Sequence, residues 1–420
     1  MSHRRLVFVA ISSIMTMLFS AGPVAAEDWP QWRGPSRDGI SKETGLLKKW
    51  PEGGPKLLWQ DADVGGGYSA PAVAGDRIYL ISSRGEADEF VRARNTSDGK
   101  VAWSIRIGNV GPNTKSMNYP GSRSTPTVVG DLLYALGSDG DLVCMETAGG
   151  KIRWKKNLRN DFGGKMGQWA YAESPLVDGD AVVCTPGGSS ATIVKLNRNS
   201  GDVIWKSAIP GGDEAAYASI TVAEAGGVRQ YVQFLSKGVV GVDANDGKFL
   251  WRFDAIVKNS PANIPTPVAR GGYVYAATGF GGGGLAKISI NANGATAEQV
   301  YLDKKLPNAI GGAVVFGDYL YGTGNVLTCA DFATGKAKWS QRSVGAASLL
   351  AADGKLFLHG ENGEVALVEA TPQEYRELGR FTPPGSPQPG KGKAWSYPAL
   401  ANGRLYIRDL GMMWCYDVNE

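Results

Sequence analysis

The sequence predicts an all-β protein: an eight-bladed β-propeller of four-stranded antiparallel blades, closed by an N-terminal strand that pairs into the last blade. Three observations predict this fold. A tight turn recurs eight times, a glycine followed four residues later by a tryptophan ends most repeats, and one strand without a hairpin partner lies near the N-terminus. The composition agrees, because 58 Gly, 12 Trp and 16 Tyr among 420 residues are typical of short strands joined by tight turns.

The recurring turn consists of two residues, mostly Gly, Asp or Asn, which tolerate positive φ in hairpins. Its copies begin about 47 residues apart on average. The residue four positions after the start of the turn is aromatic in seven of the eight copies, as expected for a strand that buries every second side chain. The turns are Gly75-Asp76, Gly130-Asp131, Gly179-Asp180, Gly227-Val228, Gly271-Gly272, Gly317-Asp318, Asp353-Gly354 and Asn402-Gly403.

A second turn follows in most repeats, and it places a glycine four residues before a tryptophan. We expect these tryptophans to fill the space between adjacent blades. Tyr301 takes the same place in repeat five and Phe381 in repeat seven. Each repeat therefore contains four strands, and four-stranded units at this period indicate a propeller. The glycine–tryptophan pairs are Gly99 and Trp103, Gly150 and Trp154, Gly201 and Trp205, Gly247 and Trp251, and Gly335 and Trp339.

The two ends of the repeat region predict how the ring closes. The last repeat, residues 397–418, has three strands, and residues 56–59 supply a spare fourth strand that ends in Trp59. Pairing this strand into the last blade removes the open sheet edges. We therefore expect one propeller domain over residues 56–420, preceded by an extension over residues 27–55 that packs on it.

The first 26 residues have the pattern of a signal peptide. Residues 3–5 are positively charged, residues 6–19 form an apolar run, and residues 24–26 supply the small side chains that signal peptidases require. The apolar run is too short to span a membrane comfortably. We expect cleavage after Ala26 and an exported soluble protein, periplasmic or extracellular, with no transmembrane segment.

Charge and composition exclude several classes of function. The formal net charge of +4 falls to +2 without the leader, and no Lys/Arg block occurs, which argues against a nucleic-acid binder. The chain has two His, one of them in the leader, so a multi-His metal site is excluded. Each cysteine lies in an apolar, strand-like run, which favours buried thiols, but the sequence does not pair them. The cysteines are Cys144, Cys184, Cys329 and Cys415.

The repeats resemble the PQQ-like, quinoprotein-type propeller repeat with its Gly-Lys-x-x-Trp ending, as in residues 99–103 and 247–251. The opening Trp-Pro-Gln-Trp-Arg-Gly-Pro-Ser-Arg-Asp-Gly at residues 29–39 resembles the start of exported PQQ-like propeller proteins of the planctomycete type. The resemblance covers about residues 28 to 419 and implies the fold without implying one activity. Such families include quinoprotein alcohol dehydrogenases and the non-enzymatic BamB-type outer-membrane assembly factor.

Loops that join the outer strand of one blade to the inner strand of the next lie on one face of a propeller. Here these loops are long and rich in glycine, aromatic and polar residues, so we expect a channel mouth that holds a small polar or aromatic ligand. The alternative is that these side chains bond to one another and close the channel. The residues at the entry to the inner strands are Tyr68, Arg123, Glu173, Tyr217, Asn263, Asn308, Trp395 and Tyr397.

The resemblance implies a specific ligand set for this mouth. Glu173 and Asn263 resemble the carboxylate and the amide that hold calcium against PQQ in quinoprotein dehydrogenases. Arg123 would face the carboxylates of the cofactor, and Trp395 or Tyr217 would stack on its rings. The pair of adjacent cysteines found in many such enzymes is absent from this sequence, and no Asp is assigned as the catalytic base.

Three functions follow from these features. The favoured hypothesis is a non-catalytic, monomeric platform that binds envelope proteins, or a small polar ligand, through the loop-rich face. The second is a PQQ- and calcium-dependent dehydrogenase of alcohols or sugars. The third is a carbohydrate-binding propeller that uses Trp395, Tyr397 and Trp169.

Overall fold

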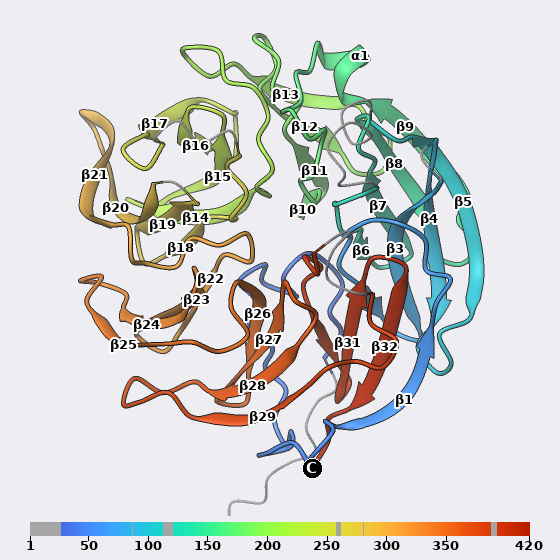
Figure 1. The fold of residues 1–420 in the computed structure, drawn as a ribbon. Helices are drawn as coiled ribbons and strands as arrows, with labels where there is room; N and C mark the ends of the chain where they lie inside the picture. Colours follow the sequence, from blue (N-terminus) through green and yellow to red (C-terminus); the bar gives the residue numbers. More distant parts are fainter. Residues whose placement is uncertain (1–26, 86, 112–120, 258–261, 280, 388–392) are drawn as a thin grey trace, which may run out of the picture.

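The computed structural model describes residues 27–420 except 86, 112–120, 258–261, 280 and 388–392. The predicted signal peptide, residues 1–26, lies outside the described residues. The chain forms a ring of eight four-stranded antiparallel sheets, which confirms the predicted eight-bladed propeller (Figure 1). The described residues contain one short helix, α1 (Leu158–Phe162). In each blade the first strand lies innermost, where it contacts the first strands of neighbouring blades.

The first four blades follow one another along the chain and share the same strand order. Their strands are β2 (Ala72–Ala74), β3 (Arg77–Arg84), β4 (Asp88–Asn95) and β5 (Val101–Asn109) in blade 1; β6 (Thr127–Val129), β7 (Leu132–Leu136), β8 (Asp141–Glu146) and β9 (Ile152–Asn157) in blade 2; β10 (Leu176–Asp178), β11 (Ala181–Cys184), β12 (Ile193–Asn197) and β13 (Val203–Ser207) in blade 3; and β14 (Thr221–Ala225), β15 (Val228–Leu235), β16 (Gly238–Asp243) and β17 (Phe249–Phe253) in blade 4.

The remaining blades repeat this order, and the last takes its outermost strand from the N-terminal part of the chain. Their strands are β18 (Val268–Arg270), β19 (Tyr273–Thr278), β20 (Gly282–Asn291) and β21 (Gly294–Asp303) in blade 5; β22 (Ala313–Phe316), β23 (Tyr319–Thr323), β24 (Leu327–Asp331) and β25 (Ala337–Gln341) in blade 6; β26 (Ala347–Ala352), β27 (Lys355–Gly360), β28 (Val365–Glu369) and β29 (Glu377–Phe381) in blade 7; and β30 (Ala399–Ala401), β31 (Arg404–Asp409), β32 (Met412–Asp417) and β1 (Lys56–Asp61) in blade 8.

The ring closes by antiparallel pairing of β1 with β32, as the sequence predicted. Leu57 lies opposite Tyr416, and Gln60 lies opposite Trp414. The contact continues beyond the strands, because the amide of Leu47 donates to the carbonyl of Val418 at 2.8 Å. The two ends of the propeller therefore share one sheet and leave no blade incomplete.

The repeated tryptophans join adjacent blades, as predicted. The indole Nε1 of Trp103 in blade 1 donates to the carbonyl of Thr147 in blade 2 at 3.0 Å. Trp154 in blade 2 donates in the same way to Arg198 in blade 3 at 2.8 Å. A bulge accompanies the residue before Trp in each of these outer strands. Bulges of this kind interrupt an exposed edge and discourage pairing with other chains.

The glycine of each second turn is required for two reasons, its backbone conformation and the space that it leaves. Gly201 has φ 75°, a backbone conformation that side chains with a Cβ disfavour. A Cβ at this position would also lie 2.9 Å from the ring of Trp154, which packs there from the preceding blade. The glycine–tryptophan repeat is therefore a contact between neighbouring blades.

Replacing Gly201 by Ala is expected to lower the free energy of unfolding by about 3 kcal/mol, because backbone strain and overpacking add. Gly130→Ala is the matched control. Gly130 has φ 62° and open space around its Cβ position, so about 1 kcal/mol is expected. Urea unfolding followed by circular dichroism measures both. Equal losses would refute a packing role for Gly201.

Blade 7 differs from the others at this position. The sequence predicted Phe381 in the place of the tryptophan, but Gly379 occupies the equivalent register, opposite Leu367. Trp50 supplies the missing ring from the N-terminal segment, with its centroid 5.3 Å from that of Phe381. A Cβ on Gly379 would lie 2.6 Å from Cβ of Trp50, so glycine makes room for this ring.

The first part of the segment before β1 occupies the centre of the ring. The sequence predicted that this segment packs on the propeller but did not predict this central position. We call residues 28–43 the N-terminal plug. Its backbone or side chains bond to a residue at the inner strand or inner turn of every blade. In order from blade 1 to blade 8, these residues are Val73, Val128, Pro175, Ile220, Thr266, Ala313, Ala351 and Asn402.

Two buried arginines attach the plug to the blades. The guanidinium of Arg37 donates to the carbonyls of Ser174 (2.9 Å), Pro175 (3.1 Å) and Ile220 (3.1 Å). That of Arg33 donates to the carbonyl of Ala313 at 2.5 Å. Burial lowers the pKa of Arg37 to about 10, while nearby Glu173 opposes this effect. A guanidinium carries five donors, so it satisfies several inner-strand carbonyls at once.

Candidate functional site

The loops that connect consecutive blades surround a cavity of about 450 Å³ at one end of the ring axis. We call it the aromatic cup. Six of its eleven lining side chains are aromatic, four are aliphatic and one is charged, so its surface is mainly apolar. The lining residues are Trp32, Tyr68, Arg123, Trp169, Ala172, Tyr217, Ala262, Ile264, Ile310, Trp395 and Tyr397.

Five of the residues expected at the channel mouth line the cup: Tyr68, Arg123, Tyr217, Trp395 and Tyr397. They come together because each lies just before the inner strand of its blade. The same position in successive repeats therefore faces the axis of the ring. These five side chains could be found from the repeat alone.

Trp32 was not among the predicted residues, because it belongs to the plug, whose position does not follow from the repeats. Its indole Nε1 donates to Thr266 Oγ1 at 3.1 Å, and its ring lies edge-on to that of Tyr397, with centroids 4.3 Å apart. Tyr397 in turn donates its hydroxyl to the carbonyl of Ile310 at 3.1 Å. The plug thus supplies part of the lining of the cup.

The aromatic side chains of the wall meet in pairs. The ring centroids of Tyr68 and Trp395 are 5.2 Å apart, and those of Trp169 and Tyr217 are 5.7 Å apart. Tilted and edge-on arrangements at these separations are favourable for aromatic rings. The wall is therefore held by contacts among its own members.

Among the described residues that line the cup, Arg123 is the one that carries a charge. Its Nη1 donates to the carbonyl of Trp169 at 3.0 Å, and the guanidinium carbon lies 6.0 Å from the ring centroid of Tyr68. Burial lowers the pKa of Arg123, although guanidinium groups stay protonated in proteins. The cup therefore carries a positive charge in an apolar wall.

Glu173 is not among the residues that line the cup. It is 3% exposed, and its carboxylate accepts hydrogen bonds from Thr185 Oγ1 (2.7 Å), from the Thr185 amide and from Gln233 Nε2 (2.9 Å). Burial raises its pKa to about 7, against the opposing effects of these donors and of Arg37. This carboxylate supports the inner strands beside the plug.

Asn263 and Asn308 also act within the protein. The side-chain amide of Asn263 donates to the carbonyls of Leu235 (2.7 Å) and Ser236 (3.2 Å). The backbone amide of Asn308 donates to Thr323 at 3.0 Å. Among the described residues, no three His, Cys, Asp or Glu side chains form a group that could hold a metal ion. The expected calcium ligands, Glu173 and Asn263, are not among the residues that line the cup.

Replacing Glu173 by Gln is expected to flatten the pH dependence of stability. The pKa of Glu173 in the folded protein, about 7, exceeds its usual value of about 4.3. The folded state therefore holds the proton more tightly, and its stability falls as the pH rises from about 4.5 to 7. The variant should lack this loss of stability. As the pH rises through this window, its free energy of unfolding should therefore gain up to about 3 kcal/mol relative to that of the wild type. Urea unfolding at several pH values measures it, and a constant difference would contradict the assignment.

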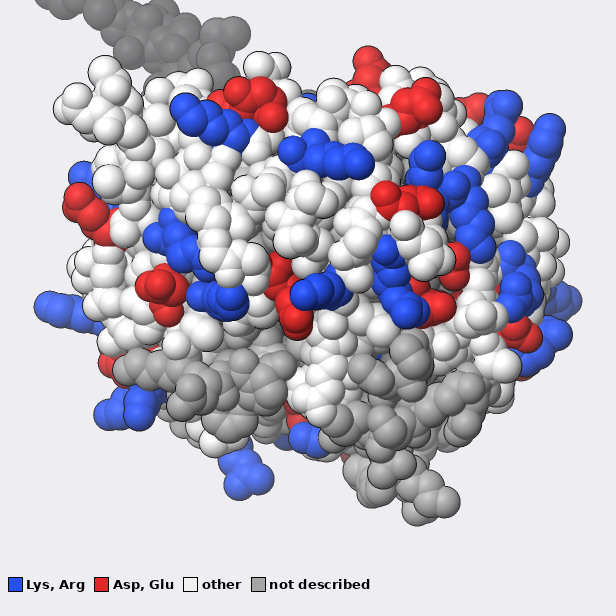
Figure 2. Space-filling view, turned by 90° about the horizontal axis from the view of Figure 1, so that it is seen from above, with Lys and Arg blue, Asp and Glu red and all other residues white. Residues whose placement is uncertain are grey.

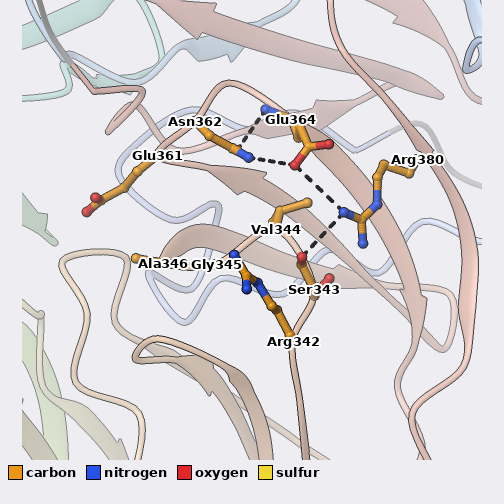
Figure 3. Close-up of a pocket in the computed structure, with 9 residues that line it drawn as sticks. All are labelled: Arg342, Ser343, Val344, Gly345, Ala346, Glu361, Asn362, Glu364 and Arg380. Carbon is orange, nitrogen blue, oxygen red and sulfur yellow. Dashed lines mark hydrogen bonds and ion pairs between the residues drawn. The ribbon is translucent and has the colours of Figure 1, made fainter. Parts of the chain in front are cut away.

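A second cavity, of about 390 Å³, lies beside blade 7 (Figure 3). Glu364 accepts a hydrogen bond from Asn362 and pairs with Arg380 at 3.7 Å. Neighbouring Glu361 accepts a 2.9 Å hydrogen bond from the indole of Trp395 in the cup. The loop between β27 and β28 thus positions one wall of the cup.

The outer side of the ring presents charges of both signs. On the side seen in Figure 2, Lys and Arg are interspersed with Asp and Glu among the described residues. Elsewhere a few ion pairs join neighbouring blades, as Arg229 does with Asp178 at 2.8 Å. The described part of this side shows no extended patch of one sign, which nucleic-acid binding would require. The four cysteines are free and buried, as their apolar surroundings predicted.

Comparison with known proteins connects this propeller to cell-envelope proteins. The family described as "Outer membrane protein assembly factor BamB" matches residues 41–163 and 91–341. The factor of that name from Yersinia pestis is 22% identical over 270 residues, which are 62% of this chain and 63% of the relative. The one from Salmonella typhimurium is 27% identical over 141 residues, 33% of this chain and 31% of the relative. The chain thus spans less than two thirds of these relatives.

Solved structures show the same fold at low sequence identity. BamB from Moraxella catarrhalis superposes with a TM-score of 0.56 at 17% identity, covering 85% of this chain and 97% of that chain. A quinohemoprotein alcohol dehydrogenase from Pseudomonas putida HK5 superposes with a TM-score of 0.60 at 12% identity, covering 93% and 80%. These likenesses establish the architecture and assign no activity.

Proposed function

Because this chain belongs to the family of the outer membrane protein assembly factor BamB, we propose that it is a non-catalytic platform. In this proposal the protein is exported to the cell envelope after cleavage at Ala26. It binds partner polypeptides there through the face that carries the aromatic cup. Among the described residues, no helix is long and apolar enough to cross a membrane.

The aromatic cup is the observation that carries this proposal. Aromatic and apolar side chains gathered around one hollow are typical of binding sites. The carboxylates near the ring axis have other partners, since Glu173 bonds to Thr185 and Gln233. The described lining of the cup is mainly aromatic and aliphatic, which suits the recognition of a partner.

Complementation of a deletion strain tests the platform. The native host would lack the gene and receive either the wild type or a Tyr68→Ala/Trp395→Ala variant. Folded outer membrane proteins are measured by their heat-modifiable mobility on gels. We expect the wild type to restore their level and the cup variant to fail. Val203→Ala/Ile204→Ala, on an exposed outer strand, is the matched control and should restore it. Full activity of the cup variant would contradict the proposal.

A PQQ-dependent dehydrogenase is the second candidate, favoured by the flat rings and the guanidinium of the cup. Arg123, Trp395 and Tyr217 would suit a flat carboxylate, whereas Glu173 and Asn263 lie outside the lining of the cup. Titration with PQQ and Ca²⁺, followed by dye reduction with alcohols and sugars, separates the candidates. Catalytic oxidation of an alcohol or a sugar in this assay would refute the non-catalytic platform and support a dehydrogenase.

A further inference from the structure

We infer that the aromatic cup receives a single tryptophan or tyrosine side chain that projects from a partner polypeptide. The inference rests on the proposed function and specifies what the platform recognises. Four properties of the cup carry it: the chemistry of its wall, its size, its closed inner end and its one cation.

The wall selects a large apolar guest. Ten of the eleven lining residues are aromatic or aliphatic. A guest rich in hydroxyl groups would need many polar partners to replace its water, because an unpaired buried polar group costs about 1–3 kcal/mol. The paired rings of the wall offer faces and edges to a further ring, an arrangement worth about 0.5–1.5 kcal/mol beyond area burial.

The size of the cup limits the guest to part of a polypeptide. Its volume of about 450 Å³ lies toward the low end of the range for ligand pockets, roughly 300–1,000 Å³. Trp32 and Tyr397 pack edge-on against each other, and the plug fills the ring behind them. A segment cannot thread through the ring, so a side chain enters from the loop-bearing face and stops there.

The cation distinguishes among large apolar side chains. The guanidinium of Arg123 lies beside the ring of Tyr68 in the wall. A cation near an aromatic face gains about 0.5–2 kcal/mol, most with tryptophan and next with tyrosine. An aliphatic side chain gains nothing from this charge, and a lysine side chain is repelled by it. The chemistry therefore favours an electron-rich ring over leucine.

The position of the cup makes a polypeptide the natural source of this ring. Loops from many blades surround the mouth, so the chain on either side of an inserted residue would contact them. Glu361 Oε1 also accepts a 2.9 Å hydrogen bond from the indole Nε1 of Trp395, which fixes the position of this ring. A preformed wall of this kind binds with little loss of side-chain freedom.

Fluorine NMR with short peptides tests the inference. The probes are pentapeptides of sequence Gly-Gly-X-Gly-Gly with blocked ends, where X is 5-fluorotryptophan, and competitors carry Trp, Tyr, Leu or Lys at X. We expect saturable broadening of the fluorine signal by the full-length mature protein. Trp and Tyr competitors should reverse it at concentrations at least five-fold lower than Leu, and Lys should not reverse it.

Variants locate the binding site. Ala172→Trp fills the cup and should abolish broadening, while Val203→Trp, on the exposed outer strand β13, should leave it unchanged. Arg123→Met should weaken tryptophan binding by three-fold or more and leave leucine binding unchanged. Thermal unfolding by circular dichroism verifies that each variant is folded. Equal competition by Leu and Trp, or binding that survives Ala172→Trp, would overturn the inference.

Two further outcomes separate this inference from the platform itself. If N-acetyltryptophan with a free carboxylate binds ten-fold more tightly than its amide, the site serves a small anion, and the inference fails. If the peptides do not bind but Ala172→Trp still fails to complement the deletion strain, the cup serves assembly through a different guest. The platform would then stand, and the tryptophan or tyrosine guest would be wrong.

Discussion

Replacing Arg37 by Ala is expected to lower the free energy of unfolding by about 4 kcal/mol. The guanidinium donates to three inner-strand carbonyls and to Gln31 Oε1 at 3.2 Å. Its removal takes a donor from each of these acceptors, of which the carbonyl of Pro175 keeps a bond from Thr127 Oγ1 at 2.7 Å. It also takes a compensating charge away from Glu173. Losing one member of a buried charged network costs about 3–5 kcal/mol.

Urea unfolding of the wild type, Arg37→Ala and Arg342→Ala measures this effect. Arg342 lies exposed on the rim of the second cavity (Figure 3), so its replacement should change stability by less than about 0.5 kcal/mol. If Arg37→Ala were as mild as this control, the plug would contribute little to holding the blades together.

Trp414→Ala is the second change with a large expected effect, a loss of about 4 kcal/mol. Trp414 is fully buried in β32, opposite Gln60 of β1 on one side and Ile407 of β31 on the other. Its indole donates to the carbonyl of Pro384 at 2.9 Å. The cavity left by its removal would lie in the sheet that closes the ring.

Thermal unfolding and limited proteolysis measure this second change. Cleavage of the chain between the plug and β1 should accelerate, because β1 would separate from β32 more often. Trp339→Ala in blade 6 is the control, since Trp339 is only half-buried and lies away from the closure. Equal sensitivity of the two variants to protease would show that β1 does not act as a latch.

The fold was predictable because it repeats. The tight turn occurs eight times and the glycine–tryptophan ending occurs in most repeats, while the spare strand at residues 56–59 fits the gap in the last blade. A wrong assignment in one repeat therefore does not change the predicted architecture. Blade 7 illustrates such an error: Phe381 was expected where Gly379 lies, because Trp50, distant in sequence, supplies the ring.

The plug and the inner network were not predictable. Arg33 and Arg37 bond to backbone carbonyls, and every residue has a carbonyl, so no sequence pattern marks the partners. The same limit applies to Glu173. The family resemblance implied a metal ligand at this position, and it could not show that the oxygens of Glu173 accept hydrogen bonds from Thr185 and Gln233. Five of the residues expected at the channel mouth do line one cavity, because their position just before the inner strand of a repeat places them at the same end of the ring.

Site-specific photo-cross-linking in intact cells tests most directly whether the protein acts through the aromatic cup. A benzoylphenylalanine replaces Ile264 in the cup or, as control, Val203 on the outer strand β13. We predict that position 264 cross-links to outer membrane proteins or their assembly machinery, identified by mass spectrometry, and that Ala172→Trp removes these products. Cross-links to such proteins from position 203 alone, with none from position 264, would contradict it.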